Sequence, residues 1–180
     1  IGMSFFKANL VSRRKIDVFV FTTMAKPNNL FFKLFKDDVL LEKPKIIKQA
    51  STNDLYIYSL ELSEDFEFGH EYSLMMTDLP MVSVDVSNAT NFPDFDEEFY
   101  YDGDDLGAVY SKKSTSFAVW APLASDVTLK LENEDNSFNF IKMNRCEKGV
   151  YKVSVCGDLL NKKYHYLVTN SGVTRESNDP

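Results

Sequence analysis

Residues that cross-link a chain or ligate metals are scarce in this sequence. The 180 residues include two cysteines, Cys146 and Cys156, and two histidines, His70 and His165. Two cysteines are too few for a disulfide scaffold, and histidines this far apart show no zinc-ligand spacing. A single Cys146–Cys156 disulfide between neighbouring strands remains open. We therefore expect a fold that depends on its hydrophobic core and binds no metal or other cofactor.

Long apolar runs and an excess of positive charge are also missing. No stretch approaches the roughly 18 continuous apolar residues that a membrane-spanning helix needs. The 20 basic and 27 acidic residues give a net charge of −7, which disfavours nucleic acid and anionic membranes as partners. The start has no signal-peptide pattern, and Met3 resembles an initiator preceded by two foreign residues. We therefore expect a cytoplasmic protein.

Glycine and tryptophan are rare, whereas phenylalanine and tyrosine are abundant. Seven Gly and one Trp stand beside 15 Phe and 9 Tyr. Few glycines argue against collagen-like or flexible-linker architecture, and 44% hydrophobic with 26% charged residues is typical of a globular protein. A chain of this length forms one large domain or two small ones.

Most periodic segments alternate with a period of two, which is typical of half-buried β-strands. In the segment 16–21, this alternation places Ile16, Val18 and Val20 on one face. The same pattern predicts three further strands in the first half: Leu55–Leu62, Glu71–Thr77 and Met81–Val86.

The segment Asn29–Leu41 is ambiguous. A helix would place the leucines at positions 30, 34 and 41 on one face. Phenylalanine favours strands, however, and aspartate favours turns. We therefore expect a β-hairpin with Asp37 and Asp38 in its turn.

A polar segment, 87–98, interrupts the alternation, contains Pro93 and then becomes acidic. Such composition is typical of a linker. Alternation resumes beyond it in five short segments: Phe117–Ala121, Val127–Leu131, Phe138–Met143, Val150–Val155 and Tyr164–Thr169. We predict an all-β chain with two tandem antiparallel β-sandwich (immunoglobulin-like) domains, over residues 1–90 and 99–180, joined by a linker at 91–98.

Carboxylates are concentrated around that linker. Seven of them lie within twelve residues: Asp94, Asp96, Glu97, Glu98, Asp102, Asp104 and Asp105. Calcium takes six to eight oxygens, but the downstream glutamate of an EF-hand loop is missing. We expect a solvated segment with a tight turn at Asp102–Gly103 and no metal. No nucleophile–base pair or phosphate-binding loop occurs either, so we expect no catalytic residue.

Two residues stand out as candidates for binding. Alternation places Trp120 opposite the face of Phe117 and Val119. A partly exposed tryptophan either stacks on a sugar ring or packs against another domain, and we favour the second. His165 lies on a predicted strand, and we expect an outward surface residue rather than a catalytic base.

Several motifs resemble a known family. They are Phe95–Gly107 (FDEEFYYDGDDLG), Phe117–Pro122 (FAVWAP), Ala124–Val127, Gly149–Tyr151, Tyr164–Val168 and Asn178–Pro180. Residues 95–180 resemble the amino-terminal side of type I pullulanases, which are family-13 glycoside hydrolases, and in particular a family-48 carbohydrate-binding module. The first half is more loosely similar to the extra amino-terminal β-domain of those enzymes, best at Phe66–Tyr72.

The resemblance implies a parent enzyme that hydrolyses α-1,6-glucosidic branch points in pullulan, glycogen or starch. Its catalytic residues belong to a barrel that this chain lacks, so we expect a non-catalytic region that docks on the catalytic domain of the same parent. The alternative is an autonomous α-glucan-binding module. Glucan-binding relatives carry tryptophans where this sequence has Glu132–Ser137 and Ser171–Thr174, which contain no aromatic residue. We therefore expect weak glucan binding at best.

Overall fold

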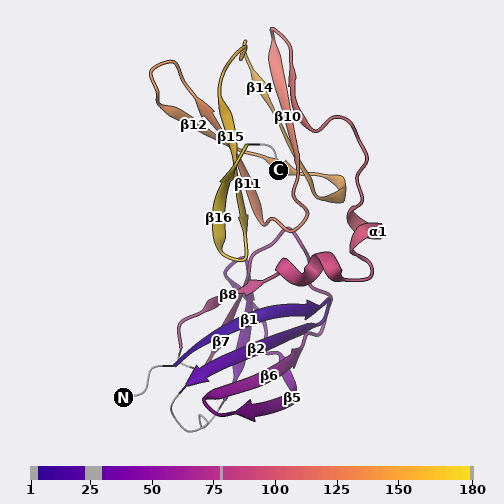
Figure 1. Cartoon of the computed structure of the whole chain (residues 1–180), viewed down its shortest axis with the longest axis vertical. Helices are drawn as coiled ribbons and strands as arrows, with labels where there is room; N and C mark the ends of the chain where they lie inside the picture. Colours follow the sequence, from indigo (N-terminus) through magenta and orange to yellow (C-terminus); the bar gives the residue numbers. More distant parts are fainter. Residues whose placement is uncertain (1–3, 23–29, 78, 179–180) are drawn as a thin grey trace. The chain divides into compact units, whose positions relative to one another are not determined.

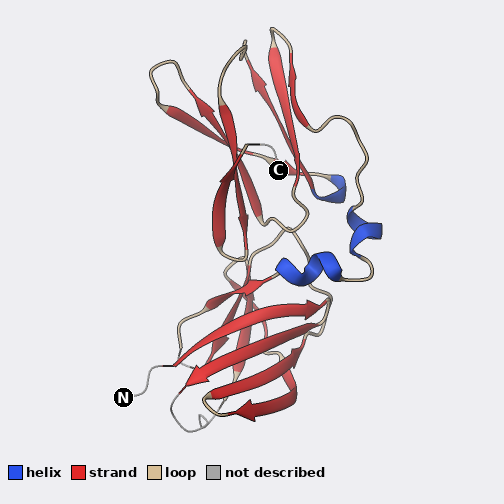
Figure 2. Cartoon of the chain, in the orientation of Figure 1, coloured by secondary structure: helices blue, strands red, loops and turns tan. Residues whose placement is uncertain are grey.

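The computed structural model describes residues 4–22, 30–77 and 79–178. The chain divides into two compact units, Ile1–Phe92 and Pro93–Pro180. Strands dominate both units, and the helices are short (Figure 2). The prediction of an all-β chain with tandem sandwich units is therefore confirmed. Within the described ranges, no helix is long and apolar enough to cross a membrane.

The first unit is built on one eight-stranded sheet (Figure 1). Its strands are β1 (Ser4–Ser12), β2 (Lys15–Thr22), β3 (Phe32–Lys36), β4 (Val39–Glu42), β5 (Lys45–Thr52), β6 (Leu55–Glu61), β7 (Tyr72–Met76) and β8 (Val82–Asp85). They are arranged in the order β4-β3-β7-β8-β1-β2-β6-β5, and β8 pairs with β1 in parallel. Phe32 on β3 contacts Tyr58 on β6, with ring centroids 5.8 Å apart. Since these strands are far apart in the sheet order, the sheet folds over itself into two layers.

The predicted alternation on β2 is confirmed. Ile16, Val18 and Val20 are fully buried, and the residues between them are partly exposed. Burying one such side chain contributes about 1.5–3 kcal/mol, so these residues fix which face of the strand points inward. The three other strands predicted in this half correspond to β6, β7 and β8.

The ambiguous segment is a hairpin, as predicted. Its first residue, Asn29, lies outside the described residues, but β3 and β4 pair as antiparallel neighbours. Asp37 and Asp38 form the turn with φ angles of 50° and 64°. Two successive residues with positive φ are typical of the type I′ turn, whose twist matches the flanking strands. The helical alternative is therefore wrong.

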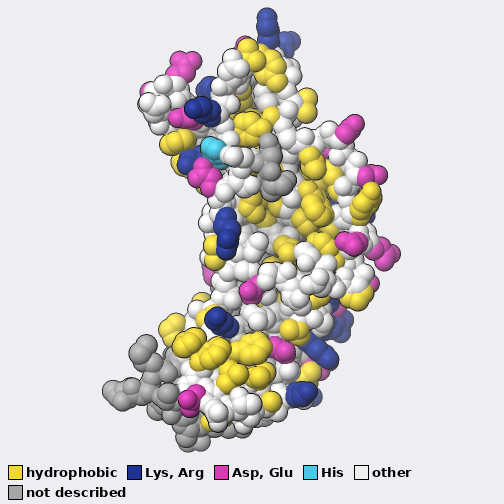
Figure 3. Space-filling model, in the orientation of Figure 1, with side chains coloured by type: hydrophobic (Ala, Val, Ile, Leu, Met, Phe, Trp, Pro, Cys, Tyr) yellow, Lys and Arg dark blue, Asp and Glu magenta, His cyan; other side chains and the backbone are white. Residues whose placement is uncertain are grey.

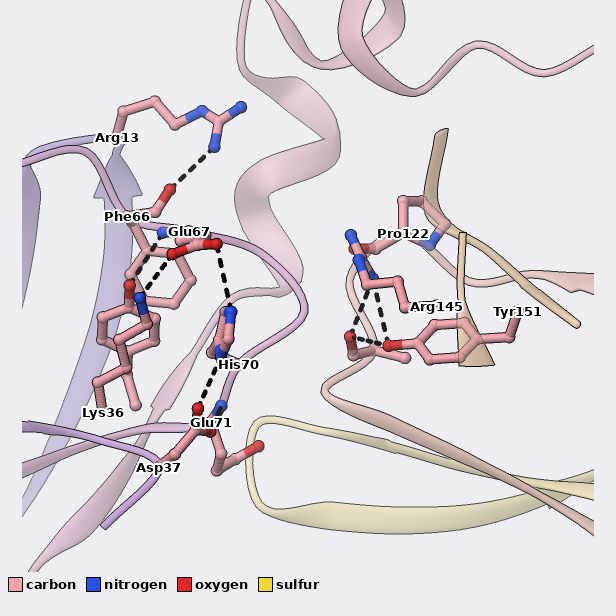
Figure 4. Close-up of polar contacts among 12 residues, drawn as sticks. Arg13, Lys36, Asp37, Phe66, Glu67, His70, Glu71, Pro122, Arg145 and Tyr151 are labelled. Atoms are coloured by element: carbon pink, nitrogen blue, oxygen red, sulfur yellow. Dashed lines mark hydrogen bonds and ion pairs between the residues drawn. The ribbon is translucent and has the colours of Figure 1, made fainter. Parts of the chain in front are cut away.

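A polar network fastens this hairpin to the loop before β7 (Figure 4). His70 lies between two carboxylates: Nδ1 is 2.6 Å from Oδ2 of Asp37, and Nε2 is 3.3 Å from Oε1 of Glu67. Lys36 Nζ donates to Glu67 Oε2 at 2.5 Å. The backbone N–H of Glu71 donates to Asp37 Oδ1 at 3.1 Å. His70 belongs to the loop, so its contact with Asp37 connects the loop to the hairpin turn through side chains.

Acid should weaken this network. The hydrogen bond from Lys36 outweighs burial and holds the pKa of Glu67 below its ordinary value of 4.5. A group with a depressed pKa stabilises the fold above its unfolded-state pKa, and this contribution is lost as the pH falls through its folded-state pKa. Glu67→Gln should therefore cost less than about 1 kcal/mol near pH 6, since the pair is largely exposed, and close to nothing near pH 2. Urea unfolding of the variant and of an exposed control, Glu64→Gln, measures this. A cost that is equal at both pH values would contradict it.

The second unit is a sandwich of two four-stranded sheets. Its elements are α1 (Phe95–Phe99), β9 (Gly107–Tyr110), β10 (Ser114–Trp120), β11 (Asp126–Glu132), β12 (Phe138–Lys142), β13 (Asn144–Arg145), η2 (Glu147–Gly149), β14 (Val150–Cys156), β15 (Tyr164–Asn170) and β16 (Val173–Ser177). One sheet has the order β13-β14-β10-β9, and the other has the order β12-β11-β15-β16. Phe117 and Val119 from the first sheet and Leu129, Leu131 and Tyr166 from the second share one buried core.

The segment that we expected to be a linker contains folded structure. The 3₁₀ helix η1 (Ser87–Asn91) occupies the first part of the polar segment 87–98, and α1 begins within it at Phe95. Phe95 and Phe99, four residues apart on that helix, are both buried. The acidic side chains between them face solvent, which explains why the segment appeared to be a linker from composition alone.

The structure also shows the chain conformation near Gly103 and the state of the two cysteines. The tight turn expected at Asp102–Gly103 is absent, and the chain bends at Asp104 instead. Tyr101 lies so close to Gly103 that a Cβ at that position would clash with the tyrosine hydroxyl and ring. Cys146 and Cys156 are exposed free thiols, so the disulfide is not formed.

Candidate functional site

Trp120 ends β10 on the outer face of its sheet. Its side chain is 38% exposed, whereas Phe117 and Val119 point into the core. The indole N–H donates to two carbonyls, that of Phe99 at 2.9 Å and that of Lys148 at 3.0 Å. The first carbonyl ends α1 and the second lies in η2, so the tryptophan fastens both short helices to the sheet. Its only polar group is therefore already used within the unit.

The motif residues that follow Trp120 meet a second motif in space (Figure 4). Arg145 donates to the carbonyls of Pro122 at 2.9 Å and Ala124 at 3.2 Å. The hydroxyl of Tyr151 donates to the same Ala124 carbonyl at 2.8 Å. Gly149 has a φ of +75°, and a Cβ there would lie 2.5 Å from Pro122. Two motifs that are far apart in the sequence thus build one junction.

The acidic stretch after α1 lies against β14. Asp105 accepts one hydrogen bond from the Tyr101 hydroxyl and forms an ion pair with Lys152 Nζ at 3.2 Å. The Tyr101 hydroxyl and then the Lys152 ammonium hold the pKa of Asp105 below its ordinary value. Across the described parts of the chain, no three His, Cys, Asp or Glu side chains are grouped so that they could hold a metal ion. Within this stretch, Asp105 is the carboxylate for which the structure shows a tyrosine and a lysine partner.

Exposed aromatic residues lie on the outer face of the opposite sheet. Phe138 and Phe140 on β12 are 42% and 60% exposed. The strand register pairs Phe140 with Lys130 on β11 and pairs Lys130 with His165 on β15, so all three share one face. Figure 3 shows a histidine beside acidic, basic and hydrophobic side chains in this part of the molecule.

Polar side chains connect the strands across this face. Lys130 Nζ lies 4.3 Å from the centre of the Phe138 ring and 3.5 Å from Glu176 Oε1. Nδ1 of His165 is 3.9 Å from the same carboxylate oxygen. We call these five residues, Lys130, Phe138, Phe140, His165 and Glu176, the β12–β16 surface. Flat rings beside hydrogen-bonding groups suit a sugar, which offers C–H faces and hydroxyls together.

The structure does not bring the two predicted binding residues together. Trp120 and His165 lie on the outer faces of opposite sheets, which point away from each other because the inner faces share the core. Sequence reasoning missed Phe138 and Phe140 because a phenylalanine on a strand is expected to point inward. The register shows the reason: Ile141 pairs with inward Leu129, which turns both phenylalanines outward.

Comparisons with known proteins show what the second unit is similar to. Residues 105–180 match the family model described as carbohydrate-binding module 48 (isoamylase N-terminal domain). A pullulanase from Bacillus subtilis strain 168 is 46% identical over 85 residues, which are 47% of this chain and 12% of that protein. The predicted resemblance to type I pullulanases is confirmed.

Solved pullulanase structures extend the likeness to both units. The crystal structure of the pullulanase from Anoxybacillus sp. LM18-11 matches 96% of this chain with a TM-score of 0.82 and 26% identity. That of type I pullulanase from B. subtilis complexed with maltose matches 96% with a TM-score of 0.80 and 29% identity. The matched regions span only 25% and 24% of those chains. The chain is thus similar to one region of these pullulanases, and its residues 105–180 are similar to carbohydrate-binding module 48.

Proposed function

We propose that this chain is the non-catalytic region of a debranching enzyme and positions a catalytic barrel that hydrolyses α-1,6-glucosidic bonds. One observation carries the proposal: both units align with pullulanase chains in which about three quarters of the length lies outside the match. A surface suited to a second domain supports it. Tyr100, Leu106 and Val109, which lie near or on the Trp120 sheet, expose 66%, 42% and 57% of their side chains. Figure 3 shows hydrophobic side chains gathered between β10 and α1.

A chimera tests this proposal. The chain would replace the matched segment of the B. subtilis pullulanase, and Val109→Asp would place a charge on the exposed face. If that face contacts the barrel, the variant should lower the melting temperature of the chimera by a few degrees, roughly 2–4 °C per kcal/mol, and leave the isolated chain unchanged. The control, Phe140→Asp, charges the opposite sheet and should not destabilise the chimera. Equal effects of both variants would contradict docking through this face.

The β12–β16 surface favours a second function, weak binding of α-glucan. Two exposed rings offer a stacking platform, and Lys130, His165 and Glu176 offer donors and acceptors for hydroxyls. The rings lie on one strand and are separated by a single residue, so the platform is short. A short, open platform predicts a dissociation constant in the millimolar range, about 4 kcal/mol of binding free energy.

Titration with maltoheptaose, followed by amide chemical shifts, measures this affinity. Phe140→Ala should weaken binding at least about fivefold, because it removes one of the two rings on which the sugar stacks. Val109→Ala, an exposed residue on the other sheet, is the matched control and should change nothing. Shift changes confined to the Trp120 side would contradict the proposed surface. Micromolar affinity would favour an autonomous glucan-binding module over a docking region.

A further inference from the structure

An open polar trough crosses the outer face of the sheet that carries Trp120. Its volume is about 540 Å³. The exposed side chains that line it include Asp105, Val109, Ser116, Cys146, Lys152 and Ser154. Small side chains form its floor, where the hydroxyl oxygens of Ser116 on β10 and Ser154 on β14 lie 3.0 Å apart. We call this feature the β10–β14 trough, and its exposed lining is within reach of a partner.

The helix α1 and the segment that follows it form an acidic rim beside this trough. Residues 94–105 carry seven carboxylates and no lysine or arginine. Asp105 pairs with Lys152 at 3.2 Å, which brings the segment against β14 and balances the charge of that lysine. Asp102 and Asp104 are exposed. Acidic side chains border the hydrophobic group between β10 and α1 (Figure 3), so the rim presents an excess of negative charge.

Apolar side chains lie beside the same carboxylates. Tyr100 and Leu106 on the rim, and Val109 in the trough, expose large parts of their side chains. Acidic and apolar groups next to each other select a partner surface that is both basic and apolar, since charge and apolar area are complementary across an interface. Arginine and lysine suit such a site, because their long stems pack on apolar surface while the charged end reaches a carboxylate.

We propose that the β10–β14 trough and its acidic rim receive a segment of the parent's catalytic domain that carries an arginine or lysine between apolar side chains. This inference rests on the proposed docking function and adds the chemistry of the partner. About three quarters of each matched pullulanase chain lies outside the matched region, so a second domain is available as the partner. The same charges disfavour a second copy of this chain, because two acidic rims would repel each other.

The two cysteines report whether the trough is covered. Both are exposed free thiols, and Cys146 lines the trough, whereas Cys156 lies at the far end of β14. In the chimera with the B. subtilis pullulanase, iodoacetamide should modify Cys146 at least about tenfold more slowly than in the isolated chain, because thiol modification requires access. The rate at Cys156, the internal control, should change less than about twofold. Mass spectrometry of the two cysteine peptides measures both rates.

Charge reversal and salt test the chemistry of the partner. Asp102→Lys combined with Asp104→Lys should raise the modification rate of Cys146 in the chimera at least about fivefold, because like charges then face each other. The melting temperature of the isolated chain should stay within about 2 °C, since both side chains are exposed. Glu132→Lys combined with Glu134→Lys makes the same charge change at the end of β11 on the opposite sheet, and it should leave the rate unchanged. In the unchanged chimera, about 0.5 M NaCl should raise the rate at Cys146 relative to Cys156 at least about threefold, because salt screens exposed charges.

The outcomes separate the basic partner from the docking function on which it rests. Equal modification of Cys146 in the chimera and in the isolated chain would overturn docking through this face and the basic partner together. Protection of Cys146 that persists at high salt and in the double lysine variant would overturn the basic partner and leave docking intact. If the double variant fails to fold, the salt series on the unchanged chimera decides the case.

Discussion

Replacing Arg145 by Met should lower the free energy of unfolding of the second unit by about 2–3 kcal/mol. The side chain supplies hydrogen bonds to the carbonyls of Pro122 and Ala124. Met has a similar length but no donor, so the Pro122 carbonyl, on a buried residue, loses this bond. A buried acceptor without a partner costs about 1–3 kcal/mol. The loss of cation–π contact with Tyr151, whose ring centre lies 5.5 Å from the guanidinium, adds to it.

Chemical denaturation of the 93–180 unit would measure this effect. Arg175→Met is the matched control, since Arg175 is exposed on β16, and it should stay within about 0.5 kcal/mol of the wild type. Tyr151→Phe removes the hydroxyl that donates to the Ala124 carbonyl, but that carbonyl keeps its hydrogen bond from Arg145. The free energy of unfolding should therefore fall by about 1 kcal/mol. Similar costs for Arg145→Met and Arg175→Met would show that the junction contributes little stability.

Trp120→Ala should cost the chain about 2 kcal/mol and loosen α1. The expected loss is smaller than the roughly 3–5 kcal/mol of a core tryptophan, because the side chain is 38% exposed. It is larger than that of a free surface residue, because the indole N–H holds the carbonyls of Phe99 and Lys148. Trp120→Phe keeps a ring and removes the donor, so it should cost about 1 kcal/mol.

Hydrogen exchange distinguishes the local effect from the global one. The amides of Glu98 and Tyr100 donate to the carbonyls of Asp94 and Asp96 within α1, and both should exchange faster in the Trp120 variants. Phe140→Ala, which removes a more exposed ring from the opposite sheet, should leave these amides unchanged. Protection of α1 that survives Trp120→Ala would mean that the buried Phe95 and Phe99 hold the helix without the indole.

Local periodicity predicted the strands that bury one face. β2, β6 and β7 each bury alternate residues, so their pattern could be found in the sequence. β5 and β16 are edge strands with most side chains exposed, and they carry little of this signal. β1 buries Phe6, Ala8 and Leu10 in clear alternation, so the sequence carries a strand pattern there too.

Long-range pairing and surface chemistry were harder to predict. The parallel pairing of β8 with β1 joins segments about 75 residues apart, and no local pattern encodes it. The sequence indicated that Trp120 faces outward and is partly exposed. In the structure, the side chain does face outward and is partly exposed. It did not indicate that the N–H is occupied, because both acceptors are backbone carbonyls, which every residue possesses. The β12–β16 surface depends in the same way on a strand register that the residues alone do not specify.

The position of the single tryptophan gives the chain an internal spectroscopic reporter. One indole produces one side-chain signal in a nitrogen-correlated proton spectrum and one class of emitter in fluorescence. Because that N–H is shared between the end of α1 and η2, its resonance responds to any event that separates either helix from the sheet. Partial exposure of the ring makes its emission sensitive to a surface that covers it. Tryptophan emission can therefore report a surface that covers the ring, and it needs no labelling. The indole resonance of nitrogen-15-labelled protein can report detachment of α1.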